Sequence, residues 1–405
     1  MKFSLEKAAD PKTSAFHVQY KSVDKVEAID KYTVRITLKE NVASIMPMLT
    51  NFHGGFIVSK KAVLEKGDKF KFDPIGTGPF MFESYTPREK AVFVKNPDYF
   101  EGKPKLDRVE LWLMPEAATR EMAFEAGKLD IIEGLRERAW IDNMKKIPQT
   151  EIDAFGPGDC AYLFFNVTKE PFNDIRVRRA INYGINRDEL LDFLGRELAV
   201  KMISPIAPSF WGATDKVPIY PFDPQKAKQL LTEAGVQLPL QVQIVMTESM
   251  DYRKIAEQVQ EQLRRIGVDM KMDIVGHSTF HQRTKNDANA FMNYYHSFSL
   301  PIANINLWRY WYSNTIIGKP AQDVNLSHYD KVDKEIEMAE KETDVKKQLA
   351  LWAEAQRKIM EDAACVPLVM VKSAFARKQY VKLGYELHDS MTICPNIVWN
   401  TDIVR

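Results

Sequence analysis

Residues 162–191 read YLFFNVTKEPFNDIRVRRAINYGINRDELL, and they specify a change from a strand to a pair of helices. The stretch opens at 162–165 with four apolar residues that favour β structure, which is typical of a buried strand. The polar Asn166 ends that run, and Pro171 marks a turn. We therefore predict a buried strand, a turn and then helix.

Both predicted helices carry local signals of their own. In the first helix, Val177, Ile181 and Ile185 recur at helical spacing, so we expect the neighbouring arginines on the opposite side of the helix. Asn186 precedes the second helix as the first residue of a capping box, and Gly195 stands where that helix should end. Nothing in this stretch matches a catalytic motif. Because so many of its residues carry strand, turn or capping signals, we infer a structural role.

Composition limits the class of protein. A chain of 405 residues can bury a large core and should form two domains or more. Lys and Arg number 56 and Asp and Glu number 55, and this balance argues against nucleic-acid binding. The apolar run at 363–371 is interrupted by Pro367 and falls short of the roughly 18 residues that a membrane helix needs. The first residues contain no apolar core of a signal peptide.

Strand and helix signals alternate along the chain. In the first half, strand patterns alternate with a helix at 117–126, and in the second half a helix at 251–266 lies between strands. This rhythm predicts an α/β fold with mixed sheets and flanking helices. The chain is expected to leave its first domain near Asn166 and to return near Phe375, so that two crossing strands form a hinge. The predicted domains are residues 1–165 with 376–405, and residues 166–375.

The sequence offers weak signals for chemistry. His277 and His281 are four residues apart, but Ser278 stands where the HExxH motif has glutamate, and His296 lies in a separate segment. We therefore predict no metal site and favour a polar surface or a ligand contact. The GTG at 76–78 lacks the GK[ST] ending of a phosphate-binding loop, and no GxSxG motif occurs. No catalytic residue and no cofactor is predicted.

The chain has three cysteines, Cys160, Cys365 and Cys394. Because the number is odd, at least one thiol has no partner within a monomer. Buried free thiols are the favoured interpretation. A disulfide between two of them stays open, since the sequence does not choose the pair.

The most informative cluster for binding is NYYHSFSLPIANINLWRYWYSN at 293–314. Aromatic side chains around one cation suit a ligand pocket, which combines apolar walls with a few polar groups. The predicted ligand-binding residues of this cluster are Tyr294, Tyr295, His296, Trp308, Arg309, Tyr310 and Trp311. Trp211, in the loop APSFWGATD, is a further candidate. The alternative is that these rings mostly fill the core.

Four motifs in a fixed order carry a resemblance to a known family. They are FDPIGTGPF at 72–80 with KNPDYFEGKPKLDRVEL at 95–111, EAGKLDIIEG at 125–134, the FN and PFNDIRVRRAINYGINRDEL of the opening stretch, and YPFDPQKAKQLLTEAG at 220–235. In this order they resemble the family 5 extracellular solute-binding proteins. These are the substrate-receiving subunits of ABC importers, and they include oligopeptide- and dipeptide-binding proteins.

The resemblance implies a two-lobed periplasmic-binding-protein fold of type II-like architecture, with a hinge at Asn166. It implies that a small solute is trapped between the lobes and passed to an ABC permease in the inner membrane, without catalysis. A periplasmic or extracytoplasmic location and a monomeric state are implied as well. The beginning of the chain resembles a segment inside the family's first domain, so we expect domain I to be incomplete at its start.

The predicted ligand departs from that of the family's peptide binders. In them the aromatic region supplies an aspartate for the peptide's ammonium group, whereas residues 288–322 of this sequence contain no acidic residue. Arg309 favours an anionic group, and the rings suit a sugar or an aromatic ring. We therefore predict a solute other than a simple linear peptide. Two alternatives stay open: an oligopeptide-binding protein of the same family, and a metal-dependent hydrolase that uses the region of His277 and His281.

Overall fold

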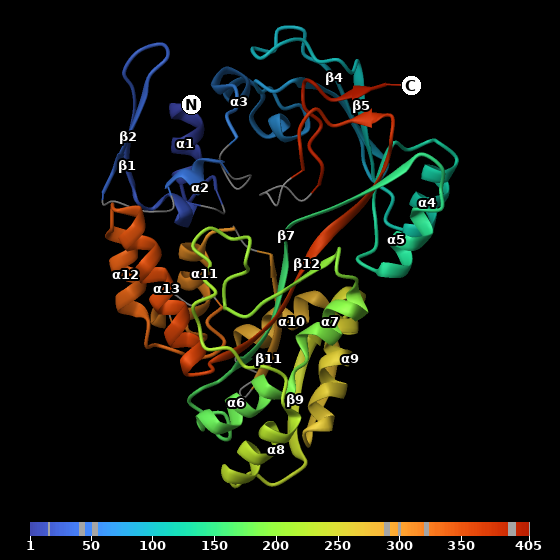
Figure 1. Ribbon diagram of the computed structural model, residues 1–405. Helices are drawn as coiled ribbons and strands as arrows, with labels where there is room; N and C mark the ends of the chain where they lie inside the picture. The colour runs from blue at the N-terminus through green and yellow to red at the C-terminus, as the bar shows by residue number, and fades with distance from the viewer. Residues whose placement is uncertain are drawn as a thin grey trace.

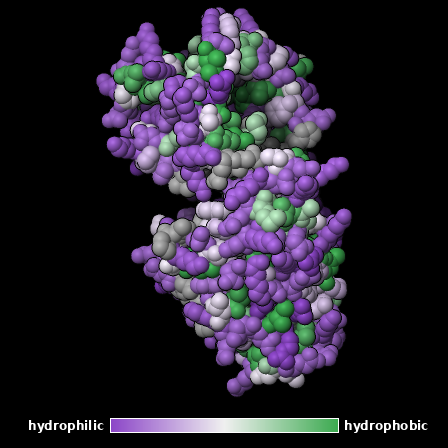
Figure 2. Space-filling view, turned by 90° about the vertical axis from the view of Figure 1, so that its left-hand side faces the viewer, coloured by the Kyte–Doolittle hydropathy of each residue, from purple (hydrophilic) through white to green (hydrophobic). Residues whose placement is uncertain are grey.

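The computed structural model describes residues 1–14, 17–39, 45–50, 56–286, 292–298, 301–319, 324–387 and 394–404. Two lobes lie one above the other and are joined by two long strands, β7 (Thr150–Phe165) and β12 (Cys365–Lys378) (Figure 1). Figure 2 shows the lobes as two masses joined through a narrower waist. The predicted α/β fold with two lobes, mixed sheets and flanking helices is confirmed.

The upper lobe in Figure 1, here called the N-terminal lobe, is built from both ends of the chain. Its elements are α1 (Lys2–Ala9), β1 (Val23–Ala28), β2 (Val34–Leu38), α2 (Ile45–Thr50), α3 (Lys60–Lys66), β3 (Phe80–Thr86), β4 (Lys90–Lys95), β5 (Arg108–Trp112), α4 (Ala117–Glu125), β6 (Ile131–Glu133), α5 (Arg138–Met144), β13 (Val381–Lys382) and β14 (Asp402–Ile403). Strands β3, β4 and β5 form one antiparallel sheet, and β1 pairs with β2.

The lower lobe, here called the central lobe, carries the helices that follow β7. Its elements are α6 (Ile175–Gly184), α7 (Arg187–Leu194), β8 (Ala199–Lys201), α8 (Pro224–Glu233), β9 (Leu240–Thr247), α9 (Met250–Arg265), β10 (Val268–Val275), α10 (His277–Lys285), β11 (Met292–Phe298), α11 (Ala303–Trp311), α12 (Asp333–Lys341) and α13 (Val345–Glu361). Strands β9 and β10 are parallel and are connected by α9, as the β-α-β pattern predicts.

The two connecting strands pair with each other along most of their length. Cys365 lies opposite Phe164 at one end and Lys378 lies opposite Thr150 at the other, in antiparallel register. The register shifts twice, both times within residues 367–373. β11 pairs with the other edge of β7, while β6 and β8 pair with β12. The domain boundaries given above stay a prediction.

The position of residues 162–165 in the fold explains why all four are apolar rather than alternating with polar residues. All four side chains are buried, because both faces of β7 are covered. Tyr162 and Phe164 face the core that contains α11 and α13. Leu163 and Phe165 face the core that contains α6 and α9. A strand covered on both faces has no solvent side that would require polar residues.

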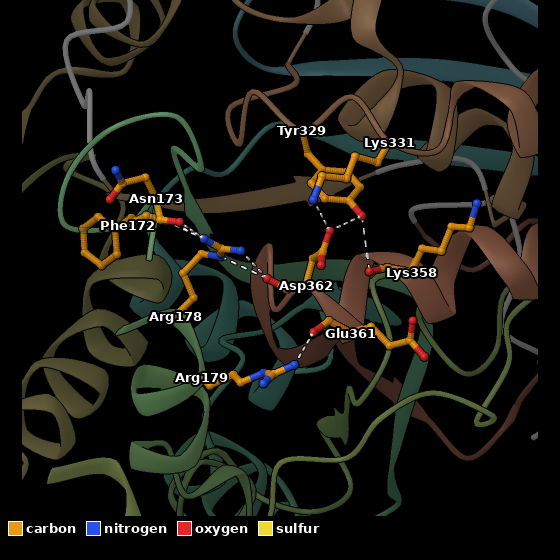
Figure 3. Close-up of polar contacts among 9 residues, drawn as sticks. All are labelled: Phe172, Asn173, Arg178, Arg179, Tyr329, Lys331, Lys358, Glu361 and Asp362. Carbon is orange, nitrogen blue, oxygen red and sulfur yellow. Dashed lines mark hydrogen bonds and ion pairs between the residues drawn. The ribbon is translucent and has the colours of Figure 1, made fainter. Parts of the chain in front are cut away.

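One expectation for α6 is wrong. Arg178 is only 5% exposed, although the helical spacing places it among the arginines expected on the side opposite the apolar face. Its guanidinium donates hydrogen bonds to the carbonyl oxygens of Phe172 at 2.6 Å and Asn173 at 3.1 Å, and its Nη2 donates to that of Asp362 at 2.7 Å (Figure 3). The side chain is buried because backbone carbonyls of two separate segments satisfy it.

The carbonyl of Asp362 follows the C-terminal end of α13, where helical carbonyls lack partners within the helix. Arg179 adds a second contact there, donating to the carbonyl of Glu361 at 3.1 Å (Figure 3). Two positive side chains therefore cap the negative end of α13. The arginines of the PFNDIRVRR motif thus join α6 to the helix that precedes β12.

The cap of α7 is partly as predicted. The Asn186 side chain accepts hydrogen bonds from the backbone of the first helical turn, and Gly195 ends the helix. In a capping box, Glu189, three residues after Asn186, would accept a hydrogen bond from the Asn186 backbone N–H, but no such bond occurs among the described residues. Gln262 accepts from the Asn186 backbone N–H instead, at 2.8 Å, while Glu189 pairs with Arg265 at 3.2 Å. A neighbouring helix therefore completes the capping box.

The cysteines differ in accessibility. Cys160 and Cys365 are buried and free, whereas Cys394 is free and exposed. Burial raises the pKa of Cys160 to about 12, and it raises the pKa of Cys365 as well. Because thiolate is the reactive form, both buried thiols should be inert in the folded protein.

We expect one thiol to react with an aromatic disulfide reagent in the folded protein and three in denaturant, measured by absorbance. Cys394→Ser should abolish the reaction of the folded protein, since it removes the exposed thiol. Fewer than three thiols in denaturant without reductant would mean that a disulfide has formed. More than one in the folded protein would contradict the burial of Cys160 and Cys365.

Within the described ranges, no helix combines the length and the apolar character that crossing a bilayer requires.

Candidate functional site

The aromatic cluster predicted from the sequence centres on α11. Ala303, Leu307, Tyr310 and Trp311 recur at helical spacing and are buried, so they form the apolar stripe of this helix. Trp308 and Arg309 lie beside that stripe and are partly exposed. The helix therefore uses some of its rings for the core and presents others at the surface.

Strand β7 holds α11 in place through aromatic contacts. The ring of Tyr310 stacks on Phe164 with centroids 6.0 Å apart, and Trp311 lies 5.5 Å from the same ring. At the end of the helix, the Thr315 hydroxyl donates to the Trp308 carbonyl at 3.1 Å. These contacts fix the backbone from which Trp308 and its neighbours project.

Trp308 contacts the other lobe. The ammonium group of Lys21, in the turn before β1, lies 5.0 Å from the centre of the Trp308 ring, within the range of a cation–π interaction. Within its own lobe, Tyr312 stacks against Trp308 with centroids 6.0 Å apart and planes inclined by 22°. The indole thus contacts a ring of its own lobe and a cation of the N-terminal lobe.

Arg309 lies next to Trp308 on the same helix. Its guanidinium lies 5.3 Å from the centre of the Tyr310 ring, and Nη1 donates to the Tyr310 hydroxyl at 3.4 Å. The residue is partly exposed. A planar guanidinium in such a place can bind a carboxylate through two parallel hydrogen bonds.

Backbone hydrogen bonds join Trp211 to the beginning of α11. Its backbone N–H donates to the Pro301 carbonyl at 2.9 Å, and its own carbonyl accepts from Ala303 at 2.8 Å. Trp211 is 44% exposed, and its ring meets that of Trp352 edge to face with centroids 5.1 Å apart. The following Gly212 allows this packing, because a Cβ atom there would lie 2.5 Å from the Trp352 ring. The structure thus brings Trp211 and α11 together.

The other predicted binding residues occupy different positions. Tyr310 and Trp311 are each 1% exposed and belong to the core. Tyr294, Tyr295 and His296 lie on β11, where their backbones pair with residues 161–163 of β7. The side chains of these three fall outside what the structure describes, so their role in binding stays a prediction.

Asn166 directly follows β7 and is fully buried. Its side-chain oxygen accepts from the backbone N–H of Thr168 at 3.1 Å and from the Thr168 hydroxyl at 2.7 Å. In the described part of the chain, its Nδ2 has no hydrogen-bond partner. A role for Asn166 in the hinge stays a prediction.

Sequence reasoning missed two contacts that join the lobes beside the connecting strands. One is the Lys21–Trp308 contact, and another is an ion pair between Lys254 on α9 and Glu137, which precedes α5. Residues 137 and 254 are 117 positions apart. Spacing rules describe neighbours within one element, so no local signal could have identified these pairs.

A hollow of about 460 Å³ lies in the N-terminal lobe, with Glu151, Asp153, Arg377 and Tyr385 in its wall. Arg377 is already engaged there, because it donates to both carboxylate oxygens of Asp153 at 2.7 and 3.0 Å. The neighbouring Asp153 raises the pKa of Arg377. This paired, buried charge is better explained as structural support for the ends of β7 and β12.

The two histidines of α10 are close together. The Nε2 atoms of His277 and His281 are 3.1 Å apart, and the rings meet edge to face. Both residues are exposed, and partial desolvation together with the adjacent His277 lowers the pKa of His281. Among the described residues, no group of three or more His, Cys, Asp or Glu side chains is arranged to hold a metal ion.

Two lobes on a two-strand connection, with exposed aromatic and cationic groups where the lobes meet, define the class of two-lobed solute-binding proteins. Residues 1–319 match the family model described as bacterial extracellular solute-binding proteins, family 5 Middle. The chain belongs to this family, whose members are binding proteins for transport rather than enzymes.

Known relatives bind different ligands. A solved structure of MoaA from A. tumefaciens R10 in complex with mannopinic acid is 37% identical, with a TM-score of 0.83, and the match covers all of this chain and 82% of that chain. Di/tripeptide-binding protein 2 of Pseudomonas aeruginosa is 28% identical over 90% of this chain and 69% of its own length. Heme-binding protein A of Haemophilus influenzae is 28% identical over 60% of this chain, and the match spans only 46% of that relative's length.

Proposed function

We propose that this chain is the solute-binding subunit of an ABC importer. It captures a small anionic solute with sugar-like or aromatic character between its lobes, and delivers it to a permease in the inner membrane. It acts in the periplasm, as a monomer and without catalysis. The observation that carries this proposal is that Trp308 and Arg309 are neighbours on α11 and both partly exposed, at the place where Lys21 of the other lobe contacts Trp308.

The chemistry of the surface supports an anionic ligand. Arg309 and Lys21 supply positive charge from the two lobes, and residues 288–322 contain no Asp or Glu. Trp308 and Trp211 supply flat apolar faces of the kind that pack against a sugar or an aromatic ring. A ligand that touches both lobes stabilises the closed form, because those contacts exist only when the lobes meet. The acid bound by the relative MoaA agrees with this charge pattern.

We expect mannopinic acid to bind the wild-type protein and Arg309→Ala to weaken that binding about tenfold to a hundredfold, measured by isothermal titration calorimetry. A hydrogen-bonded charged pair contributes about 1.5–3 kcal/mol, which corresponds to this range. Arg309→Lys should recover only part of the affinity, because an ammonium group cannot form the two-pronged contact.

The matched control is Arg176→Ala, which removes an arginine from the surface of α6 in the same lobe and should leave affinity unchanged. Equal affinity in wild type and Arg309→Ala would contradict the role of Arg309. If neither mannopinic acid nor other sugar-derived or aromatic acids bind, the proposed ligand class is wrong.

A peptide is the second candidate ligand, because the Pseudomonas relative is a di/tripeptide-binding protein. Unmodified di- to pentapeptides and their N-acetylated forms separate the two candidates in the same calorimeter. Micromolar binding of the free peptides that is lost on acetylation would establish recognition of an ammonium group, and would replace the anionic ligand.

A further inference from the structure

The histidine pair of α10 has the geometry of two adjacent metal ligands. An imidazole nitrogen lies about 2.0–2.1 Å from a bound zinc ion, so two neighbouring nitrogens of a tetrahedral or octahedral site lie roughly 2.9–3.4 Å apart. The Nε2 atoms of His277 and His281 are 3.1 Å apart, within that interval. Residues four apart on a helix face the same side, so the backbone of α10 holds the two rings together.

A contact behind the pair orients His277. Its Nδ1 lies 3.4 Å from the hydroxyl oxygen of Thr247, a buried residue at the end of β9. When Nδ1 carries the proton, it donates to this oxygen, and the lone pair of Nε2 points toward His281. A hydrogen bond from the second ring nitrogen is the usual support of a histidine that binds a metal.

We propose that His277 and His281 bind one transition-metal ion, such as Zn²⁺, Ni²⁺ or Cu²⁺, through their Nε2 atoms. These ions favour imidazole ligands. In the described ranges no third His, Cys, Asp or Glu side chain completes a group around the pair. Water or a dissolved anion therefore fills the other coordination positions, and the ion exchanges with solution. This proposal departs from the expectation of no metal site, which was drawn from the missing HExxH motif and stays a prediction.

The site lies on the edge of the central lobe that faces the N-terminal lobe. Strands β9 and β10 are parallel, so α9 and α10 both begin at the same edge of that sheet. Lys254, in the first turns of α9, pairs with Glu137 of the N-terminal lobe. This edge of the sheet therefore faces the N-terminal lobe. Ligands of open α/β sheets characteristically bind beyond the carboxyl ends of the strands. The inference requires no solute, so it stands apart from the proposed function.

The test uses full-length protein without a polyhistidine tag, first treated with a chelator and then titrated with Cu²⁺. Calorimetry is expected to give one site, and electron paramagnetic resonance is expected to show two equivalent imidazole nitrogens on the copper. His277→Gln and His281→Gln should each weaken binding at least about tenfold, a loss of about 1.4 kcal/mol, and reduce the signal to one nitrogen.

Two matched controls keep the test specific. Ser278→Ala changes the same exposed helix turn without removing a ligand, and His17→Gln removes a histidine from the N-terminal lobe; both should bind Cu²⁺ like the wild type. Circular dichroism checks that every variant is folded. The proposal is overturned if wild-type protein binds no Cu²⁺, or if both substitutions of the pair leave the affinity and the two-nitrogen signal unchanged.

Discussion

Arg178→Ala is expected to lower the free energy of unfolding by about 3–4 kcal/mol. Arg178 is buried and donates hydrogen bonds to the carbonyl oxygens of Phe172, Asn173 and Asp362. Alanine leaves those carbonyls without a donor and opens a void that water cannot easily fill. The contacts also tie α6 to the end of α13, so their loss loosens the junction from which β12 begins. Urea unfolding followed by circular dichroism measures the change.

Arg176→Ala is the matched control, because Arg176 occupies the same helix two residues earlier but is exposed. It pairs with Asp174 at 2.6 Å, and an exposed ion pair contributes about 1 kcal/mol or less. Arg178→Lys should fall between the two, since one ammonium group cannot reach all the carbonyls. Equal stability of the Arg178→Ala and Arg176→Ala proteins would show that the buried network contributes little.

Gly158→Ala is expected to lower the free energy of unfolding by about 3–5 kcal/mol. Gly158 lies on β7 with φ of +66°, a conformation that costs an L-residue about 1–2 kcal/mol. A Cβ atom there would also lie 2.3 Å from the carbonyl oxygen of Val371 on β12. Because that neighbour is backbone, the two connecting strands must move apart to accept the methyl group. Urea unfolding of the purified variant gives the magnitude.

Gly127→Ala separates the two causes. Gly127 has nearly the same φ, +70°, but a Cβ atom there would meet nothing within 4 Å. This variant should therefore show the conformational cost alone, and the difference between the two variants measures the close approach of β7 and β12. If both variants are destabilised equally, β7 and β12 can move apart at Gly158 without lowering the free energy of unfolding.

Local signals predicted the elements that depend on neighbouring residues. Asp223 caps α8 by accepting from the Lys226 backbone N–H at 2.8 Å, and Pro224 occupies the first turn, an arrangement that an Asp-Pro pair favours at the start of a helix. The same holds for Asn186 and α7. In each case donor and acceptor are a few residues apart, so the sequence contains the whole interaction.

The errors come from interactions between distant segments. Arg178 is 184 positions from Asp362, and helical spacing carries no information about a carbonyl so far away. The aromatic cluster was recognisable from composition, but the exposure of Trp308 and the burial of Trp311 depend on how α11 packs against β7. Lys21 reaches Trp308 from the other lobe, and only the fold brings them together.

The N-terminal lobe is assembled from both ends of the chain, and this sets an order of folding. Lys105 donates its backbone N–H to the carbonyl of Trp399 at 3.1 Å, and its ammonium group pairs with Asp402 at 3.3 Å. The ribosome makes the residues of the central lobe before it makes residues 399–402. The contacts of Lys105 with Trp399 and Asp402 therefore form only after the central lobe has been synthesised, whereas the central lobe can bury most of its core earlier. During this delay, part of the chain stays unfolded and accessible to molecular chaperones.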